Sequence, residues 1–220
     1  MTYISFSHHL RKIADPIWQK EQNHPFIKQI GNGTLKLEKF QYFLKQDYLF
    51  LIGFSRLIAL IIAKCEKLED MRFFSNLLDD TLNVEMNLHV SFSEEFNITS
   101  SDIIETKASP TTVAYTNHLI NIGYSQSALH AAVAILPCSW GYSEIGKKLY
   151  KLGVPNNAPL YAKWIEMYNS YEFAQLASSL RDFIDRESED VSVYQKKSLE
   201  SIFVQSSHLE YEFWNAAWNI

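Results

Sequence analysis

Apolar residues recur at intervals of three and four along much of this chain, and few residues interrupt the pattern. In the segment around residue 45 this spacing joins Phe40, Phe43, Leu44, Tyr48, Leu51 and Ile52. Such spacing gathers them on one face of an α-helix, whereas a half-buried strand alternates apolar and polar residues. Because only 7 Gly and 6 Pro occur in 220 residues, we expect long helices joined by short loops. No alternating run is long enough to indicate a sheet.

The breaks in this pattern predict a single all-α domain, residues 1–220, built as a bundle of roughly eight helices. The expected helices cover residues 3–22, 35–65, 68–96, 110–123, 125–152, 158–186 and 190–218. Pro16 should kink or divide the first of them. Thr34 should be the N-cap of the second, because it follows the turn Gly31-Asn32-Gly33. The polar segment 97–102 should be a break.

Charge, hydropathy and cysteine content exclude several classes of protein. The formal net charge is −5 and Lys and Arg form no run, which argues against a nucleic-acid partner. The N-terminus lacks the apolar core of a signal peptide. The most apolar run, 49–63, contains Arg56 and is too short to span a bilayer. We expect Cys65 and Cys138 to be free thiols in a reducing cytoplasm.

Cys138 directly follows Pro137 near the end of the almost wholly apolar segment 127–139. A helix that is apolar all round is normally buried. Pro137 removes one backbone hydrogen bond and so places an irregularity beside the thiol. Two interpretations stay open on this stretch alone. The cysteine is either a nucleophile or an inert core residue, since free cysteine is among the most buried residue types.

Two carboxylates stand out by their apolar surroundings. Asp47 lies four residues after Phe43 and four before Leu51, which places it on the apolar face of its helix. A buried carboxylate needs a partner or a raised pKa, although a solvated position is the alternative. Glu210 and Glu212 share an aromatic segment, and periodicity does not decide which of them points inward.

Glu85 and His89 are four residues apart and therefore share one helical face. They could ligate a metal, but di-iron bundles use Glu-x-x-His pairs on two helices together with two further glutamates. This chain has one Glu-x-x-x-His, so we expect an ion-paired or hydrogen-bonded pair and no metal.

Tyrosines in apolar contexts form the last group, comprising Tyr48, Tyr115, Tyr142, Tyr161, Tyr168 and Tyr171. Most buried tyrosines are core residues with one satisfied hydroxyl. A cluster of them with a thiol and two acids would instead form a flat apolar slot with polar tips, which suits a small aromatic heterocycle.

The chain resembles the TenA family, also called thiaminase II, over essentially its full length. The stretches that carry the resemblance are HPFIKQIGNGTL (24–35), FLKQDYLFL (43–51), NVEMNLH (83–89), SPTTVAYTNHL (109–119), LPCSWGYSEIG (136–146), YAKWIEMY (161–168) and SSHLEYEFW (206–214). The resemblance implies the haem-oxygenase-like fold, a homotetramer, a cytoplasmic location, and no metal or organic cofactor.

The resemblance also implies roles for individual residues. Cys138 matches the catalytic nucleophile of the cysteine-containing subgroup, and Glu210 matches the acid/base glutamate. Asp47 matches the aspartate that binds the pyrimidine.

Four aromatic residues match positions that contact the substrate or line its pocket. Tyr142 and Tyr168 match substrate contacts, and Tyr115 matches a pocket-lining tyrosine. Phe50 stands where many members carry a tyrosine whose hydroxyl assists the thiol. A phenylalanine at position 50 would still stack on the pyrimidine. Tyr115 is the nearest candidate to supply the missing hydroxyl.

The implied activity is the hydrolysis of 4-amino-5-aminomethyl-2-methylpyrimidine to 4-amino-5-hydroxymethyl-2-methylpyrimidine and ammonia, which salvages degraded thiamin. Members also cleave thiamin itself, and covalent catalysis by cysteine suits both substrates. Two alternatives stay open. One is a haem or di-iron oxygenase, for which His24 fits poorly as a proximal ligand. The other is a non-catalytic pyrimidine-binding or regulatory protein.

Overall fold

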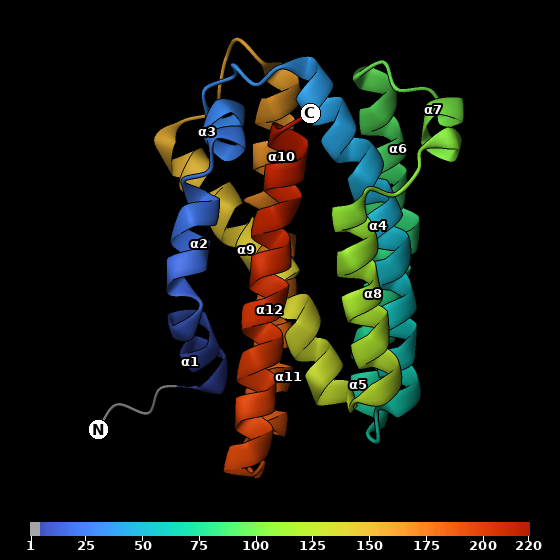
Figure 1. Ribbon diagram of the computed structural model, residues 1–220, viewed down its shortest axis with the longest axis vertical. Helices are drawn as coiled ribbons and strands as arrows, with labels where there is room; N and C mark the ends of the chain where they lie inside the picture. The colour runs from blue at the N-terminus through green and yellow to red at the C-terminus, as the bar shows by residue number, and fades with distance from the viewer. Residues whose placement is uncertain (1–4) are drawn as a thin grey trace. The chain divides into compact units, whose positions relative to one another are not determined.

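The computed structural model describes residues 5–220, and within that range it contains helices and no strand. The helices are α1 (Phe6–Ile13), α2 (Asp15–Gln22), α3 (Pro25–Gly31), α4 (Leu37–Lys64), α5 (Leu68–Asp80), the π-helix η1 (Thr81–Glu85), α6 (Met86–Glu95), α7 (Ser100–Glu105), α8 (Pro110–Ser125), α9 (Ala128–Leu152), α10 (Pro159–Tyr168), α11 (Tyr171–Glu187) and α12 (Val193–Trp218) (Figure 1). The predicted all-α class is confirmed.

The helices group into two compact units. The first unit combines Met1–Thr34 with Ala132–Glu212, and the second combines Leu35–Ala131 with Phe213–Ile220. Two helices, α9 and α12, continue from one unit into the other. The single domain expected from the sequence stays a prediction.

In the first unit, α1 packs on α2 and α11, and α10 packs on α3 and α11. Trp18, from α2, is fully buried, and its ring stacks on Phe203 of α12 with centroids 5.9 Å apart. The indole Nε1 donates to Ser207 Oγ over 2.9 Å. Burial of an aromatic ring together with a satisfied polar tip is the arrangement in which tryptophan stabilises a core.

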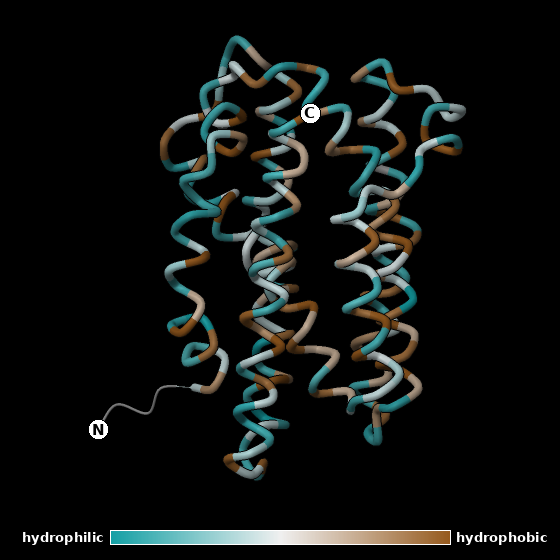
Figure 2. Tube along the Cα trace, viewed as in Figure 1, coloured by the Kyte–Doolittle hydropathy of each residue, from teal (hydrophilic) through white to brown (hydrophobic). Residues whose placement is uncertain are grey.

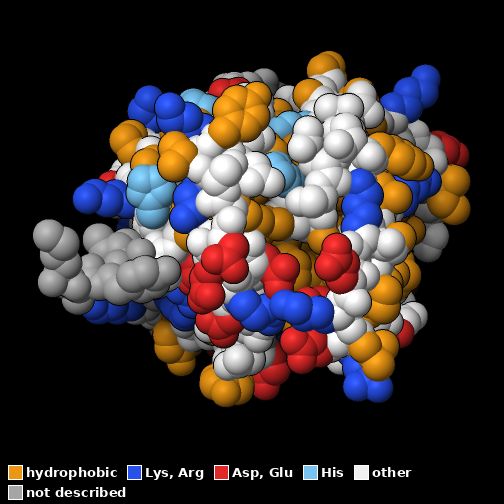
Figure 3. All heavy atoms as spheres, turned by 90° about the horizontal axis from the view of Figure 1, so that it is seen from below, with side chains coloured by type: hydrophobic (Ala, Val, Ile, Leu, Met, Phe, Trp, Pro, Cys, Tyr) orange, Lys and Arg blue, Asp and Glu red, His pale blue; other side chains and the backbone are white. Residues whose placement is uncertain are grey.

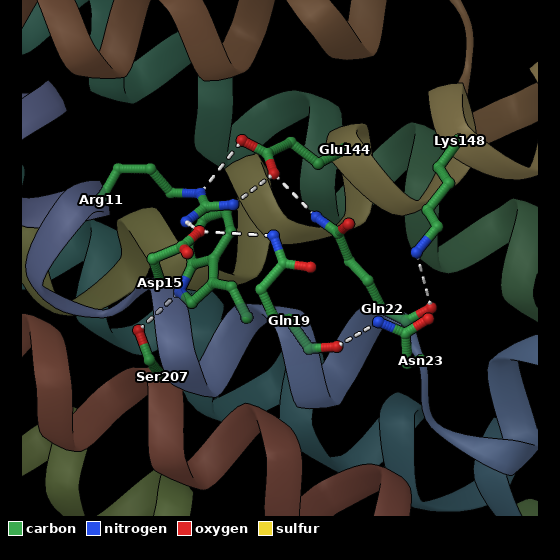
Figure 4. A network of polar contacts seen from close by, with 9 residues as sticks. Arg11, Asp15, Gln19, Gln22, Asn23, Glu144, Lys148 and Ser207 are labelled. Atoms are coloured by element: carbon green, nitrogen blue, oxygen red, sulfur yellow. Dashed lines mark hydrogen bonds and ion pairs between the residues drawn. The ribbon is translucent and has the colours of Figure 1, made fainter.

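A polar network holds α9 to the two N-terminal helices of the first unit (Figure 4). Arg11 donates through Nη1 to Asp15, over 2.8 Å, and through Nη2 to Glu144, over 2.9 Å. Gln22 Nε2 donates to the same Glu144 carboxylate over 2.8 Å. Glu144 lies six residues after Cys138 on α9, so the network fixes the part of the helix that carries the thiol.

In the second unit, α4 packs on α5, α6 and α8. Gln46 attaches α4 to the start of α8, because its Oε1 accepts from Ser109 N, over 2.9 Å, and from Thr112 Oγ1, over 2.7 Å. Hydrophobic residues recur along both helices in Figure 2. Gly53 permits a close approach, since an added Cβ would lie 2.6 Å from a methyl carbon of Thr116.

Several boundaries differ from those expected. Thr34 is not an N-cap. Its backbone N–H and its hydroxyl bond Asn32 Oδ1, and Lys36 occupies the N-cap position of α4. Because the Thr34 hydroxyl is used in this turn with Asn32, it does not accept from a backbone N–H of the following helix. In the expected break, Thr99 and Asp102 form a capping box that starts α7.

Other expected helices are divided. Pro16 lies in the first turn of α2, so the predicted division of 3–22 is confirmed for the described residues. Segment 158–186 forms α10 and α11, because Ser170 caps a new helix through Phe173 N. Segment 68–96 is divided by the π-helix η1. Pro137 remains inside the continuous α9.

Within residues 5–220, α4 is the helix that by length and composition could cross a membrane. Of its most apolar window, 56% is buried inside the protein, as in the core helix of a globular domain. The helix agrees closely with the expected segment 35–65, and it extends beyond the apolar run 49–63 mainly on the N-terminal side.

Candidate active site

Cys138 is partly exposed, although residues 131–137 immediately before it are all buried. Cys65 differs, since it is buried at the C-cap of α4. Reactive cysteines are accessible to a substrate, whereas structural ones are buried and inert. The apolar sequence around Cys138 favoured burial, so its accessibility is a feature that only the structure supplies.

An aromatic wall lies along α9 and α10 in the first unit. Tyr142 follows Cys138 by four residues, and its ring centroid is 4.8 Å from that of Tyr168 and 6.1 Å from that of Trp164. Gly146 lets α9 approach the end of α10, because an added Cβ would lie 2.5 Å from the carbonyl carbon of Tyr168. Gly146, the second of the two glycines in the sequence stretch 136–146, is therefore required for steric reasons.

Glu210 points inward and Glu212 points outward. Glu210 is 2% exposed, whereas Glu212 is an exposed residue two positions further along α12. Ser206 and Ser207, about one turn earlier on α12, are also fully buried. The structure thus decides the choice that periodicity left open.

His24 has a structural role in the first unit. It is the N-cap of α3, where its Nδ1 accepts from Phe26 N over 3.1 Å, and its ring packs edge-on against Tyr211. Among the residues that the structure describes, no group of three or more His, Cys, Asp or Glu side chains could hold a metal ion.

Asp47 is buried in the second unit and forms an ion pair with His89. Its Oδ2 lies 2.8 Å from His89 Nε2, and the two side chains are 7% and 5% exposed. The pair is electrostatic, since Nε2 is not aligned for a hydrogen bond. Burial alone would lower the pKa of His89, but the charges of Asp47 and Glu85 outweigh it and raise the pKa.

Glu85 is the second carboxylate near this imidazole. Burial raises its pKa to about 7, the charge of His89 opposes that rise, and the charge of Asp47 adds to it. Part of its side-chain surface remains accessible even though protein surrounds the carboxylate. The sequence predicted a pair between Glu85 and His89, and it did not identify Asp47 as the ion-pair partner of His89.

Phe50 and Tyr115 meet on facing helices of the second unit. Their ring centroids are 4.7 Å apart with the planes inclined by 40°, and Phe213 packs edge-on against Phe50 at 5.9 Å. Both Phe50 and Tyr115 are buried. Phe50, which lacks the hydroxyl, is therefore a neighbour of Tyr115, whose hydroxyl is the expected replacement.

The expected site residues divide between the two units. The first unit contains Cys138, Tyr142, Tyr168 and Glu210, and the second contains Asp47, Phe50 and Tyr115. Of the tyrosines expected to be buried, Tyr171 is 76% exposed, because it begins α11 directly after the cap. The roles inferred from resemblance stay predictions.

The chain matches the model of the TENA/THI-4/PQQC family over residues 11–220. The chain belongs to this family. An aminopyrimidine aminohydrolase of Halalkalibacterium halodurans is 43% identical over 216 residues, which are 98% of this chain and 96% of that protein. This membership confirms the resemblance to TenA, while placement in the cysteine-containing subgroup stays a prediction.

Solved structures of the TenA type support the same assignment. A TenA homologue from P. horikoshii has a TM-score of 0.89 and 31% identity, and the match covers 98% of this chain and 99% of that one. Haem oxygenase-1 from the cyanobacterium Synechocystis has a TM-score of 0.67 at 12% identity, over 97% of this chain and 92% of that one. That likeness concerns the fold alone, and it confirms the haem-oxygenase-like architecture.

Proposed function

We propose that this member of the TenA family hydrolyses 4-amino-5-aminomethyl-2-methylpyrimidine to 4-amino-5-hydroxymethyl-2-methylpyrimidine and ammonia, and that it also hydrolyses thiamin. The observation that carries the proposal is the composition of the first unit, which holds an accessible thiol, an inward carboxylate and an aromatic wall. The 43% identity to an aminopyrimidine aminohydrolase over nearly the whole chain supports it.

The chemistry begins with Cys138. A C–N bond on a methylene attached to an aromatic ring does not break readily, so the ring must first lose its aromaticity. The Cys138 thiolate forms a bond to C6 of a pyrimidine that is protonated on a ring nitrogen, and the ring accepts the electron pair as that positive charge is neutralised. Asp47, as a carboxylate at the pyrimidine edge, stabilises the positive charge of the protonated ring. The covalent adduct divides one difficult step into two easier ones.

The second stage is acid–base chemistry by Glu210. The adduct expels the amine from the methylene at C5, and Glu210 supplies the proton with which ammonia leaves. Glu210 then takes a proton from water as the water oxygen bonds to the same methylene carbon. Finally the C6–S bond breaks, Cys138 leaves as a thiolate, and the ring regains its aromaticity. The net reaction consumes one water and releases one ammonia.

The aromatic residues would hold the pyrimidine flat for this attack. Tyr142 and Tyr168 would contact the substrate, Tyr115 would line its pocket, and Phe50 would stack without a hydroxyl to offer the thiol. Neither metal nor organic cofactor takes part in the proposed steps.

The proposal is tested by incubating the purified protein with the aminopyrimidine and, separately, with thiamin, and by measuring ammonia and the hydroxymethyl product. We expect release of ammonia from the aminopyrimidine. Binding of both compounds without turnover would overturn the proposal and favour a pyrimidine-binding or regulatory protein. A Soret band in the absorption spectrum would favour a haem oxygenase.

We further propose a cytoplasmic homotetramer without a nucleic-acid or membrane partner. Support comes from a surface groove of about 710 Å³ in the second unit, whose lining includes Leu49, Ile52, Ile120 and Tyr124. On the face drawn in Figure 3, most Asp and Glu side chains gather near the lower centre, and Lys and Arg lie partly between them and partly scattered toward the edges, without forming a stripe. Sedimentation at micromolar concentration should give a tetramer, and a monomer would contradict the proposed assembly.

A further inference from the structure

The proposed function requires Asp47 to act as a carboxylate at the edge of the pyrimidine, although its side chain is buried. A carboxylate removed from water is destabilised in its ionised form and tends to take up a proton unless a partner favours the charge. Only the ionised form can stabilise positive charge at the edge of a pyrimidine. A positively charged partner beside a buried carboxylate favours that form.

His89 stands where such a partner is needed. Its Nε2 is 2.8 Å from Oδ2 of Asp47, and both side chains are almost completely buried. The two residues come from different helices, Asp47 from α4 and His89 from α6. Because the imidazole faces one of the two carboxylate oxygens, it also restricts the orientation of the other.

The backbone before α6 adds a second observation. Residues 81–85 form a π-helical turn, and Thr81 Oγ1, at its start, donates to Leu77 O of α5 over 2.8 Å. π-helical turns are rare and occur frequently at functional sites. This turn ends at Glu85, one helical turn before His89. The charged groups that act on the imidazole, among the described residues, are thus Asp47 from α4 and Glu85 from η1.

We propose that His89 is a positioning residue that holds one oxygen of Asp47 and leaves the other oxygen for the pyrimidine. Glu85 supports this arrangement by favouring the protonated imidazole. The inference rests on the proposed function, because it takes Asp47 as the residue that binds the pyrimidine.

A purely structural ion pair would behave differently from a positioning pair. Buried ion pairs often add little net stability, and removal of one partner mainly leaves an uncompensated charge. A structural role would therefore show as a loss of folded protein with unchanged substrate binding. A positioning role changes KM and the pH dependence in protein that is still folded.

The test compares His89→Asn with His130→Asn, which removes another buried histidine of the second unit whose Nδ1 pairs with Ser127 Oγ over 2.8 Å. Loss of the imidazole leaves the orientation of the Asp47 carboxylate unrestricted, so His89→Asn should raise KM for the aminopyrimidine roughly 10–100-fold, which corresponds to about 1.4–2.8 kcal/mol of binding free energy. The change in kcat should be smaller. His130→Asn should leave KM unchanged.

The pH profile supplies a readout that a structural role would not move. The pKa of His89 is raised in the folded protein, so kcat/KM of the wild type should fall at high pH as the imidazolium loses its proton, and this basic limb should be absent from His89→Asn. An unchanged KM and a retained basic limb in folded His89→Asn would overturn the inference. If the wild-type protein itself releases no ammonia, the proposed function fails instead, and the two failures are distinguishable.

Glu85→Gln provides a second variant that leaves the Asp47–His89 pair in place. Loss of this carboxylate makes the imidazolium less favourable, so His89 should lose its proton at lower pH. We expect the basic limb of the kcat/KM profile to move to lower pH. If His89→Asn does not fold and Glu85→Gln leaves that limb unmoved, the inference is wrong.

Discussion

The ring of Phe50 packs against the ring of Tyr115 with centroids 4.7 Å apart. The contact places Phe50, which lacks a hydroxyl, beside Tyr115, which carries one. That Tyr115 takes over the assisting role expected of a tyrosine at position 50 stays a prediction.

This contact leads to a prediction for Phe50→Tyr. Turnover should rise or stay unchanged if the new hydroxyl finds a partner, since a buried hydroxyl without one costs roughly 1–3 kcal/mol. Steady-state ammonia release and thermal unfolding would be measured together. Phe54→Tyr, whose parent ring is 6.0 Å from Phe50, is the control and should give no gain. A fall in turnover for Phe50→Tyr at unchanged stability would contradict the expected role of the hydroxyl.

Cys138→Ser should reduce turnover by orders of magnitude while pyrimidine binding stays near normal, because the change removes the nucleophile and keeps the shape. Binding of the hydroxymethyl product would be followed by calorimetry. Cys65→Ser should behave almost like the wild type, since that buried thiol lies at a helix end. Comparable activity in Cys138→Ser would eliminate the covalent mechanism.

Glu210→Gln should lower turnover by about 10²–10⁴-fold, the usual contribution of general acid–base catalysis. The limb of the pH–rate profile that belongs to this carboxylate should also disappear. Glu212→Gln is the matched control, because Glu212 is exposed on the same helix. A damaging Glu212→Gln together with a mild Glu210→Gln would reverse the acid/base assignment.

Gly146→Ala should destabilise the protein by about 1–3 kcal/mol, the usual cost of overpacking. The added Cβ would meet the backbone of Tyr168 at 2.5 Å, which a side-chain rotation does not relieve. Gly141→Ala, on the same helix, is the control, because the nearest atom to its Cβ is a Glu21 oxygen at 3.7 Å. There the helix propensity of alanine favours the variant by up to about 1 kcal/mol. Denaturant unfolding would measure both, and equal stabilities would contradict the close approach.

The sequence by itself determined the features that depend on short-range spacing. Intervals of three and four between apolar residues predicted helices, and they placed Asp47 on a buried face. Pro16 divided the first helical segment, because proline fits the first turn of a helix, where its missing N–H has no intrahelical partner. The ordered motifs sufficed to identify the family.

Tertiary structure decided which side chains meet, because a partner distant in sequence leaves no trace in local spacing. The Glu85–His89 spacing indicated a shared helical face, but the packing of α6 on α4 made Asp47 the ion-pair partner of His89. Glu210 and Glu212 lie in equally aromatic surroundings, and only the packing of α12 buries one and exposes the other. Cys138 likewise follows a wholly buried stretch, and its accessibility depends on what the neighbouring helices leave uncovered.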